Sequence, residues 1–197
     1  TWQKLGSELP TTNNPITKGM GRTLLRWWGW RLEGHFPNRS KMVVAVLPHS
    51  SNIDFFLAVA VLWGMGLKAT FMAKHTLFKF PFGGLFRSLG GVPVNRQSAQ
   101  GMVGQMASEF ERRKQLVLGI APEGTRSSSG DLKAGFARIA EAASVPVLPT
   151  IINYKQKTIR FGELINDVND VSSVIEQVKV EALTGMRRKA LPIQQPV

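Results

Sequence analysis

The chain has 197 residues, a length that suits one globular domain with a sizeable buried core. It contains no cysteine, which excludes disulfides, thiolate metal sites and a cysteine nucleophile. The formal net charge is +12, and residues 1–100 hold 12 Lys or Arg against 3 Asp or Glu. This basic first half predicts a polyanionic partner, which is a nucleic acid, an anionic membrane surface or a phosphorylated substrate.

Residues 1–36 are predicted to form a separate N-terminal region, in which a polar, loose arm over residues 1–16 precedes an amphipathic helix. Four apolar residues recur at helical spacing in this helix: Met20, Leu24, Trp27 and Trp28. Arg22 and Arg26 lie off that face. Tryptophan, leucine and arginine together are typical of a helix in a membrane interface. The alternative is a helix packed on the core of its own domain, with the tryptophans inside.

Residues 37–197 are predicted to form an α/β domain with a mixed, largely parallel sheet flanked by helices. Strands are expected over 42–47, 69–73, 92–94, 115–120, 145–152 and 158–161. Helices are expected over 51–66, 98–114, 134–143 and 170–189. The prolines within 145–152 favour an edge or a bend of the sheet for that strand. The longest apolar run, residues 55–67, is shorter than the roughly 18–20 residues that a spanning helix needs.

The stretch PHSSNID, residues 48–54, follows the first of these strands. Positions five apart on one α-helix diverge by about 140°, so His49 and Asp54 can meet only if a helix begins between them. Ser51 or Asn52 is a suitable N-cap, which leaves His49 in the loop and Asp54 in the first turn. A neutral imidazole beside a carboxylate is typical of a general base acting on a hydroxyl. The alternative is a capping box alone, with the acid serving the helix terminus.

Three further segments carry groups suited to a phosphate. APEGTRS follows another strand and contains the candidate binding residues Glu123, Gly124, Thr125 and Arg126. An ordinary polar turn is the alternative for this segment. GGVPVNR delivers Arg96 directly after a short strand, and Lys133 stands at a helix start, where the dipole disfavours a cation unless an anion binds nearby. The segments of His49 and Glu123 both follow a strand's carboxyl end, the usual ligand side of an open α/β sheet.

The ordered blocks HSSNID, GGVPVNR, PEGTRS and VPVLP resemble those of the lysophospholipid (1-acylglycerol-3-phosphate) acyltransferase family. The likeness covers about residues 42–152 and includes the linking stretch FMAKHTLFKFPFGGLFRSLGG. Two positions beside the motifs depart from the family pattern. Pro48 stands where many members have asparagine, and Ala121 stands where many have phenylalanine.

The resemblance implies a glycerolipid acyltransferase-like fold and a fatty acyl transfer from acyl-CoA or acyl carrier protein to a lysophospholipid hydroxyl. Its favoured acceptor is 1-acylglycerol-3-phosphate, with phosphatidic acid as the product. His49 would be the general base and Asp54 would orient it, while Arg96 and residues 123–126 would hold the glycerol phosphate. No metal and no bound cofactor is expected. The apolar segment 76–89 would line an acyl groove or touch lipid, or else belong to the core, and the chain would be cytoplasmic and peripheral on an anionic membrane.

Other functions remain open at this point. One is acyl transfer to a different hydroxyl acceptor, and another is non-catalytic peripheral lipid binding, although such a protein should lack an intact His/Asp pair. An esterase or thioesterase would require a Gly-x-Ser-x-Gly motif to present a nucleophilic serine, and this motif is absent from the sequence. A nucleic-acid-binding domain would interleave cations with aromatics along one face, whereas the aromatics here crowd into apolar segments.

Overall fold

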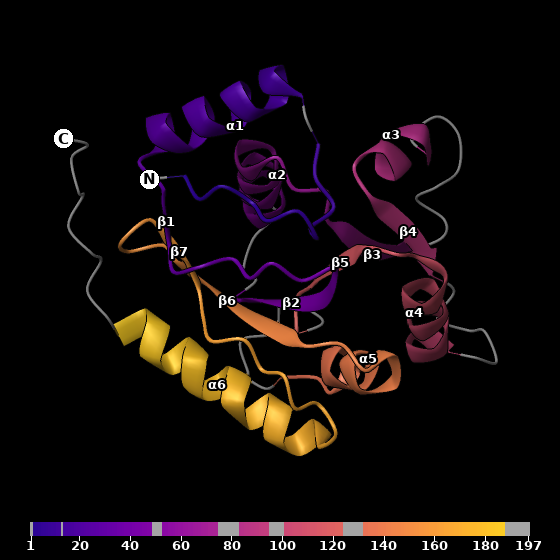
Figure 1. Ribbon diagram of the computed structural model, residues 1–197. Helices are drawn as coiled ribbons and strands as arrows, with labels where there is room; N and C mark the ends of the chain where they lie inside the picture. Colours follow the sequence, from indigo (N-terminus) through magenta and orange to yellow (C-terminus); the bar gives the residue numbers. More distant parts are fainter. Residues whose placement is uncertain are drawn as a thin grey trace.

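The computed structural model of the 197-residue chain describes residues 2–12, 14–48, 53–74, 83–94, 101–123 and 132–187. Its strands are β1 (Arg31–Glu33), β2 (Lys41–Leu47), β3 (Thr70–Lys74), β4 (Gly91–Val94), β5 (Leu116–Ile120), β6 (Val147–Asn153) and β7 (Thr158–Phe161). Its helices are α1 (Pro15–Trp28), α2 (Ile53–Met65), α3 (Gly83–Ser88), α4 (Gly101–Arg112), α5 (Gly135–Ala143) and α6 (Val171–Arg187). The helices lie on both faces of one sheet (Figure 1).

The sheet has the order β1-β7-β6-β2-β5-β3-β4. Neighbouring strands run parallel except β6 and β7, which form an antiparallel pair from Thr150↔Phe161 to Asn153↔Thr158. The predicted mixed, largely parallel sheet flanked by helices is therefore confirmed. β2 lies between β5 and β6 in the middle of the sheet. The end of β2 at Leu47 therefore lies at the middle of the sheet edge.

The expectation that β6 lies at an edge of the sheet is wrong, because β6 pairs with β2 on one side and β7 on the other. Pro149 is tolerated because its nitrogen points away from β2. The amide of Val147, two residues earlier, donates to Ile165 on the β7 side, and alternate residues of a strand direct their amides the same way. The β7 ladder begins only at Thr150, so the missing N–H of Pro149 interrupts no regular pair.

The two faces of the sheet bury separate apolar clusters. α4, α5 and α6 cover one face, where Phe110 and Phe136 are almost fully buried. α1 and α2 cover the other face, where Leu25 and Leu57 are buried. The predicted loose arm is wrong for residues 2–12, because Leu9 is only 2% exposed and belongs to this second cluster. The polar composition of this segment gave no indication that Leu9 is buried in the second cluster, or that the Trp2 side chain packs against the same cluster.

Helix α1 is capped at both ends. The side chain of Asn14 accepts hydrogen bonds from the amides of Ile16 and Thr17, and Pro15 occupies the first turn, where its missing N–H costs nothing. Gly29 ends the helix with φ 75°, and the Trp30 amide donates to the Leu25 carbonyl at 2.8 Å. The chain therefore turns sharply from α1 into β1, a short edge strand that the sequence pattern did not indicate.

The apolar stripe predicted for this helix is divided between the inside and the outside. Leu24 and Trp28 are half-buried beside Leu25, whereas Met20 is 48% and Trp27 is 83% exposed. Positions 16, 20 and 27 fall on one outward stripe, and Ile16 is exposed as well. The helix thus packs on the core and still presents large apolar side chains to its surroundings.

Gly21 permits α1 and α2 to cross closely. A Cβ at this position would lie 2.3 Å from the Gly64 amide nitrogen and 2.5 Å from the Ala60 carbonyl oxygen. We expect Gly21→Ala to lower the free energy of unfolding by roughly 1–3 kcal/mol, because the helices must separate. Gly19→Ala is the matched control: its Cβ meets nothing within 4 Å, so it should add about 1 kcal/mol through helix propensity. Urea unfolding measures both, and equal signs for the two changes would contradict the close crossing.

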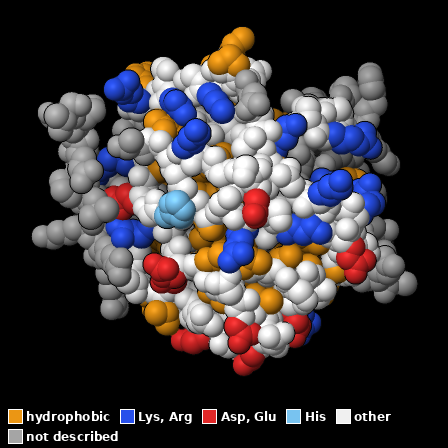
Figure 2. All heavy atoms as spheres, in the orientation of Figure 1, with side chains coloured by type: hydrophobic (Ala, Val, Ile, Leu, Met, Phe, Trp, Pro, Cys, Tyr) orange, Lys and Arg blue, Asp and Glu red, His pale blue; other side chains and the backbone are white. Residues whose placement is uncertain are grey.

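The helical layers differ in charge. In Figure 2, Lys and Arg side chains gather over the part of the surface where α1 lies in Figure 1, and Asp and Glu side chains gather along the opposite, lower edge near α6. Exposed acids of that lower layer include Glu141, Asp167, Asp170 and Glu176. Within the described ranges, no helix has the length and apolarity needed to cross a membrane.

Candidate active site

The carboxyl ends of five mutually parallel strands, β2 to β6, meet at one edge of the sheet. His49 comes two residues after β2, Glu123 three residues after β5, and Arg96 two residues after β4. The topology therefore brings the predicted site segments to the same edge, as parallel-strand packing requires. His49 and Arg96 themselves lie outside the described residues, as do Gly124, Thr125 and Arg126.

Asp54 stands in the first turn of α2, as predicted for a helix that begins within PHSSNID. Its side chain is only 2% exposed. The Tyr154 hydroxyl donates a hydrogen bond to Asp54 Oδ1. The helix N-terminus also favours a negative charge at this place. A buried carboxylate is thus held by its helix and by a neutral donor from across the sheet edge.

Glu123 and Lys133 lie at the base of one loop. Pro122 is buried and Glu123 is half-buried just beyond β5. The Lys133 amide donates to the Pro122 carbonyl at 2.8 Å, which closes the loop between them. Lys133 is exposed and precedes α5 by two residues. The structure therefore brings the first and last of the predicted phosphate-binding residues of this loop near one another.

Arg96 follows a strand that is not next to β2. Three strand spacings separate β2 from β4, so at about 4.8 Å each their ends lie about 14 Å apart. A ligand contacted by both segments leaves much of this distance to be covered by side chains, of which arginine is one of the longest.

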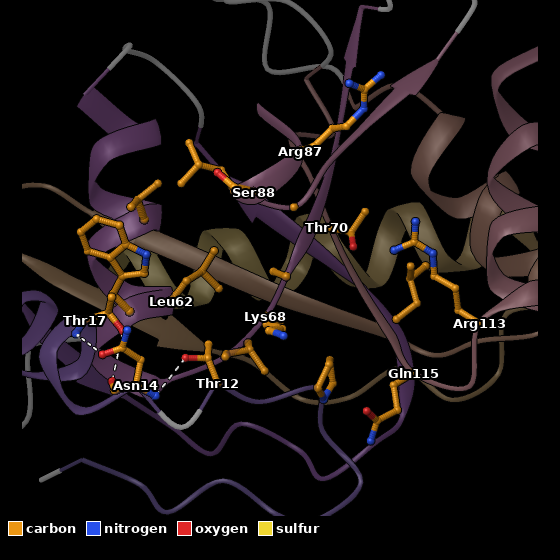
Figure 3. Close-up of a pocket in the computed structure, with 18 residues that line it drawn as sticks. Thr12, Asn14, Thr17, Leu62, Lys68, Thr70, Arg87, Ser88, Arg113 and Gln115 are labelled. Atoms are coloured by element: carbon orange, nitrogen blue, oxygen red, sulfur yellow. Dashed lines mark hydrogen bonds between the residues drawn. The ribbon is translucent and has the colours of Figure 1, made fainter. Parts of the chain in front are cut away.

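Two cavities flank the sheet. A pocket of about 500 Å³ is lined by Lys68, Arg87 and Arg113 near the starts of β3, β4 and β5, so it opens at the edge opposite to Asp54 (Figure 3). A smaller cavity of about 110 Å³ lies between α2 and the sheet and is lined mainly by apolar residues such as Leu57 and Val117. The larger pocket belongs to neither of the predicted site segments, and the smaller one suits an apolar group.

Sequence reasoning missed Tyr154 and Trp30. Tyr154 is the only tyrosine of the chain and follows β6 directly. The rule that pointed to His49 and Glu123, a polar residue just past a parallel strand, applies equally to Tyr154. Trp30 carried no such signal, because β1 was not expected. Of the apolar segment 76–89, suggested for an acyl groove, a lipid contact or the core, residues 76–82 lie outside the described residues, and the following six residues form α3.

Comparison with known proteins identifies the class. Residues 31–153 match the family model described as Acyltransferase, so the chain belongs to the acyltransferase family. Human 1-acyl-sn-glycerol-3-phosphate acyltransferase beta is 34% identical over 186 residues, which is 86% of this chain and 64% of the relative. The 1-acyl-sn-glycerol-3-phosphate acyltransferase of Streptococcus pneumoniae is 25% identical over 175 residues, which is 80% of this chain and 64% of the relative.

The fold has a solved counterpart. The 1-acyl-sn-glycerophosphate (LPA) acyltransferase PlsC of Thermotoga maritima superposes with a TM-score of 0.62 and 18% identity, over 89% of this chain and 80% of that one. At that identity the likeness concerns the fold. The chain spans 64% of the length of the human and the pneumococcal relatives, so their full lengths contain segments with no counterpart here.

Proposed function

We propose that this protein transfers a fatty acyl group from an acyl thioester to the hydroxyl of 1-acylglycerol-3-phosphate, giving phosphatidic acid. The observation that carries the proposal is the family match over residues 31–153, which includes both PHSSNID and APEGTRS. The names of the human and pneumococcal relatives support this acceptor. The meeting of the candidate segments at one sheet edge supports a single site for base and phosphate.

His49 is the general base in this proposal, and Asp54 orients its imidazole. The imidazole takes the hydroxyl proton while the oxygen attacks the thioester carbonyl carbon. The tetrahedral intermediate then expels the thiolate, which takes the proton back from the imidazolium and leaves as thiol. The buried carboxylate of Asp54 stabilises the imidazolium between these steps. No acyl-enzyme forms, and no metal or bound cofactor takes part.

The phosphate of the acceptor is assigned to Arg96, Thr125, Arg126 and Lys133, with Gly124 allowing close approach of the backbone. Glu123 accepts a hydrogen bond from a glycerol hydroxyl or holds one of the arginines. The reacting hydroxyl and the phosphate of this acceptor are separated by only two carbons and one ester oxygen, so the long side chain of Arg96 must cover much of the 14 Å or so between the ends of β2 and β4 to reach the phosphate.

A thiol-release assay tests the reaction. Acyl-CoA and lysophosphatidic acid are supplied in mixed micelles, and a thiol-reactive dye reports free CoA without background, because the protein has no cysteine. We expect release that depends on the acceptor. Release of thiol without acceptor would indicate a thioesterase. No release with any of several acceptors, whether acyl-CoA or acyl carrier protein is the donor, would favour a non-catalytic lipid-binding protein.

We further propose that the protein is cytoplasmic and binds peripherally to an anionic membrane through α1. The outward side chains of Ile16, Met20 and Trp27 are the apolar support for this. Arg26 is exposed on the flank of that stripe, where anionic headgroups would lie, and Arg22 is exposed on the side of α1 that faces α2. Arg22 is also anchored, because its Nε donates to the Gly64 carbonyl at 3.0 Å and its guanidinium lies over the Trp2 ring.

Point substitutions test the membrane contact better than a deletion of residues 1–35, because that deletion would also remove β1 and the buried Leu9. We expect Ile16→Ser, Met20→Ser and Trp27→Ser together to lower partitioning onto phosphatidylglycerol vesicles by at least about 100-fold, since each side chain contributes about 1.5 kcal/mol or more. The control is Val180→Ser with Leu183→Ser on α6, two positions that are each 53% exposed. Equal loss in both variants would contradict a specific role of α1.

A further inference from the structure

Tyr154 reaches the buried carboxylate from a separate part of the chain. It is the first residue after β6, and β6 pairs with β2 up to Leu47↔Ile151, just before PHSSNID begins. Its hydroxyl donates to Oδ1 of Asp54, one hundred residues earlier in the chain. Tyr154 is 38% exposed at the sheet edge, whereas Asp54 is 2% exposed. The contact thus joins two strand ends at the candidate site.

The ring that carries this hydroxyl is itself fixed. Trp30 packs edge-on against Tyr154, with ring centroids 5.5 Å apart and planes at 85°. The backbone of Trp30 is held by its hydrogen bond to Leu25 at the end of α1. The Lys157 ammonium, from the turn that follows Tyr154, donates to the Trp28 carbonyl at 3.0 Å. The turn after β6 and the end of α1 are therefore tied to each other beside the phenol, and Trp30 supports its ring.

We propose that Tyr154 is a positioning residue for the reaction, acting through Asp54. This inference rests on the proposed function, in which Asp54 orients His49. A carboxylate rotates about its last side-chain bond unless its oxygens are held, and a buried one has little water to hold it. A donor fixed on Oδ1 keeps the carboxylate plane in one orientation and leaves its remaining lone pairs directed elsewhere. Supporting contacts of this kind set the geometry of the group that does the chemistry.

Two substitutions separate the hydroxyl from the ring. Tyr154→Phe removes one oxygen and keeps the contact with Trp30, whereas Tyr154→Leu removes both. We expect Tyr154→Phe to lower kcat about ten-fold at unchanged KM for both substrates, the size expected when one hydrogen bond to a charged group is lost. A merely structural role predicts that Tyr154→Phe keeps the wild-type kcat and that only Tyr154→Leu is impaired. That result would overturn the inference.

A spectroscopic test does not depend on activity. Because the chain has a single tyrosine, protein labelled with ¹³C at the tyrosine ζ position gives one resonance. Donation to a carboxylate draws electron density onto the phenol oxygen, so we expect an upfield shift of that resonance in Asp54→Asn. Glu141→Gln, an exposed change on α5, is the charge-matched control and should leave it in place. An unmoved resonance in folded Asp54→Asn would overturn the inference, whatever the kinetics.

The two failures are distinguishable. A wild-type protein without acyl transfer overturns the proposed function and with it this role, even if the resonance shows the contact. An active wild type whose Tyr154→Phe variant is equally fast overturns the role of Tyr154 alone. A ten-fold loss in kcat together with the shifted resonance supports both.

Discussion

Alanine in place of His49 is expected to lower kcat by about 10²–10⁴-fold, the contribution typical of a general base. The thiol-release assay measures it with saturating acyl-CoA and lysophosphatidic acid. KM should change little, because the imidazole acts on the reacting proton rather than on the phosphate or the acyl chain. This is the largest effect on activity that the proposed mechanism entails.

His35→Ala is the matched control for this change. His35 is exposed and its ring nitrogen lies 3.4 Å from the Gln3 amide. It follows β1, which runs antiparallel to β2 and β6 and therefore ends at the edge of the sheet opposite to the site. It should keep the wild-type rate. The kcat of Asp54→Asn should lie between those of His49→Ala and His35→Ala, because the amide keeps the shape of the carboxylate but loses the charge that stabilises the imidazolium. A His49→Ala variant with near wild-type kcat would exclude His49 as the base.

Glu33→Ala is expected to lower the free energy of unfolding by about 3–5 kcal/mol, a large part of the stability of a domain this size. Glu33 in β1 and Arg160 in β7 are directly paired in the sheet, with Nη2 and Oε2 2.5 Å apart. Their side chains are 5% and 13% exposed. Removal of the carboxylate leaves a buried guanidinium whose Nε already has no hydrogen-bond partner among the described residues.

Urea unfolding measures this loss, and Glu109→Ala is its control. Glu109 pairs at 2.7 Å with both Arg112 and Arg113, which are 68% and 37% exposed, so its removal should cost no more than about 1 kcal/mol. Replacing both partners, as Glu33→Leu with Arg160→Met, should recover most of the loss because no unpaired charge remains. A Glu33→Ala protein as stable as the control would show that the buried pair contributes nothing.

The sequence was sufficient for most of the fold, because most of the parallel strands are short apolar runs and because the helices α4 and α5 carry apolar residues at a clear helical period. It was also sufficient for the start of α2, since Asp54 needs a helix that begins between it and His49. Prediction from the sequence failed where the structure depends on one or a few residues that the surrounding sequence pattern does not indicate. Leu9 is one apolar side chain in a polar arm, and β1 is a three-residue strand held by pairing with β7.

The candidate site was predictable in its parts and not in its connections. His49, Glu123 and Arg96 each follow a strand, but their distances depend on strand order, and the order that puts β4 three places from β2 is not written in any local pattern. The contact between Tyr154 and Asp54 joins residues one hundred positions apart. Such pairs become visible only when the sheet is assembled.

The unequal charge of the two helical layers has a consequence before any contact is made. Cations over the α1 layer and acids beside α6 give the molecule an electric dipole whose positive pole lies on the side of α1, the helix that carries the exposed Ile16, Met20 and Trp27. If the protein binds an anionic bilayer through α1 as proposed, the field of the bilayer turns the molecule as it approaches, so that collisions occur with the apolar stripe leading. The advantage reaches only about 8 Å at physiological ionic strength. Rate of capture should therefore fall with added salt much more steeply than the residence time once the stripe is inserted.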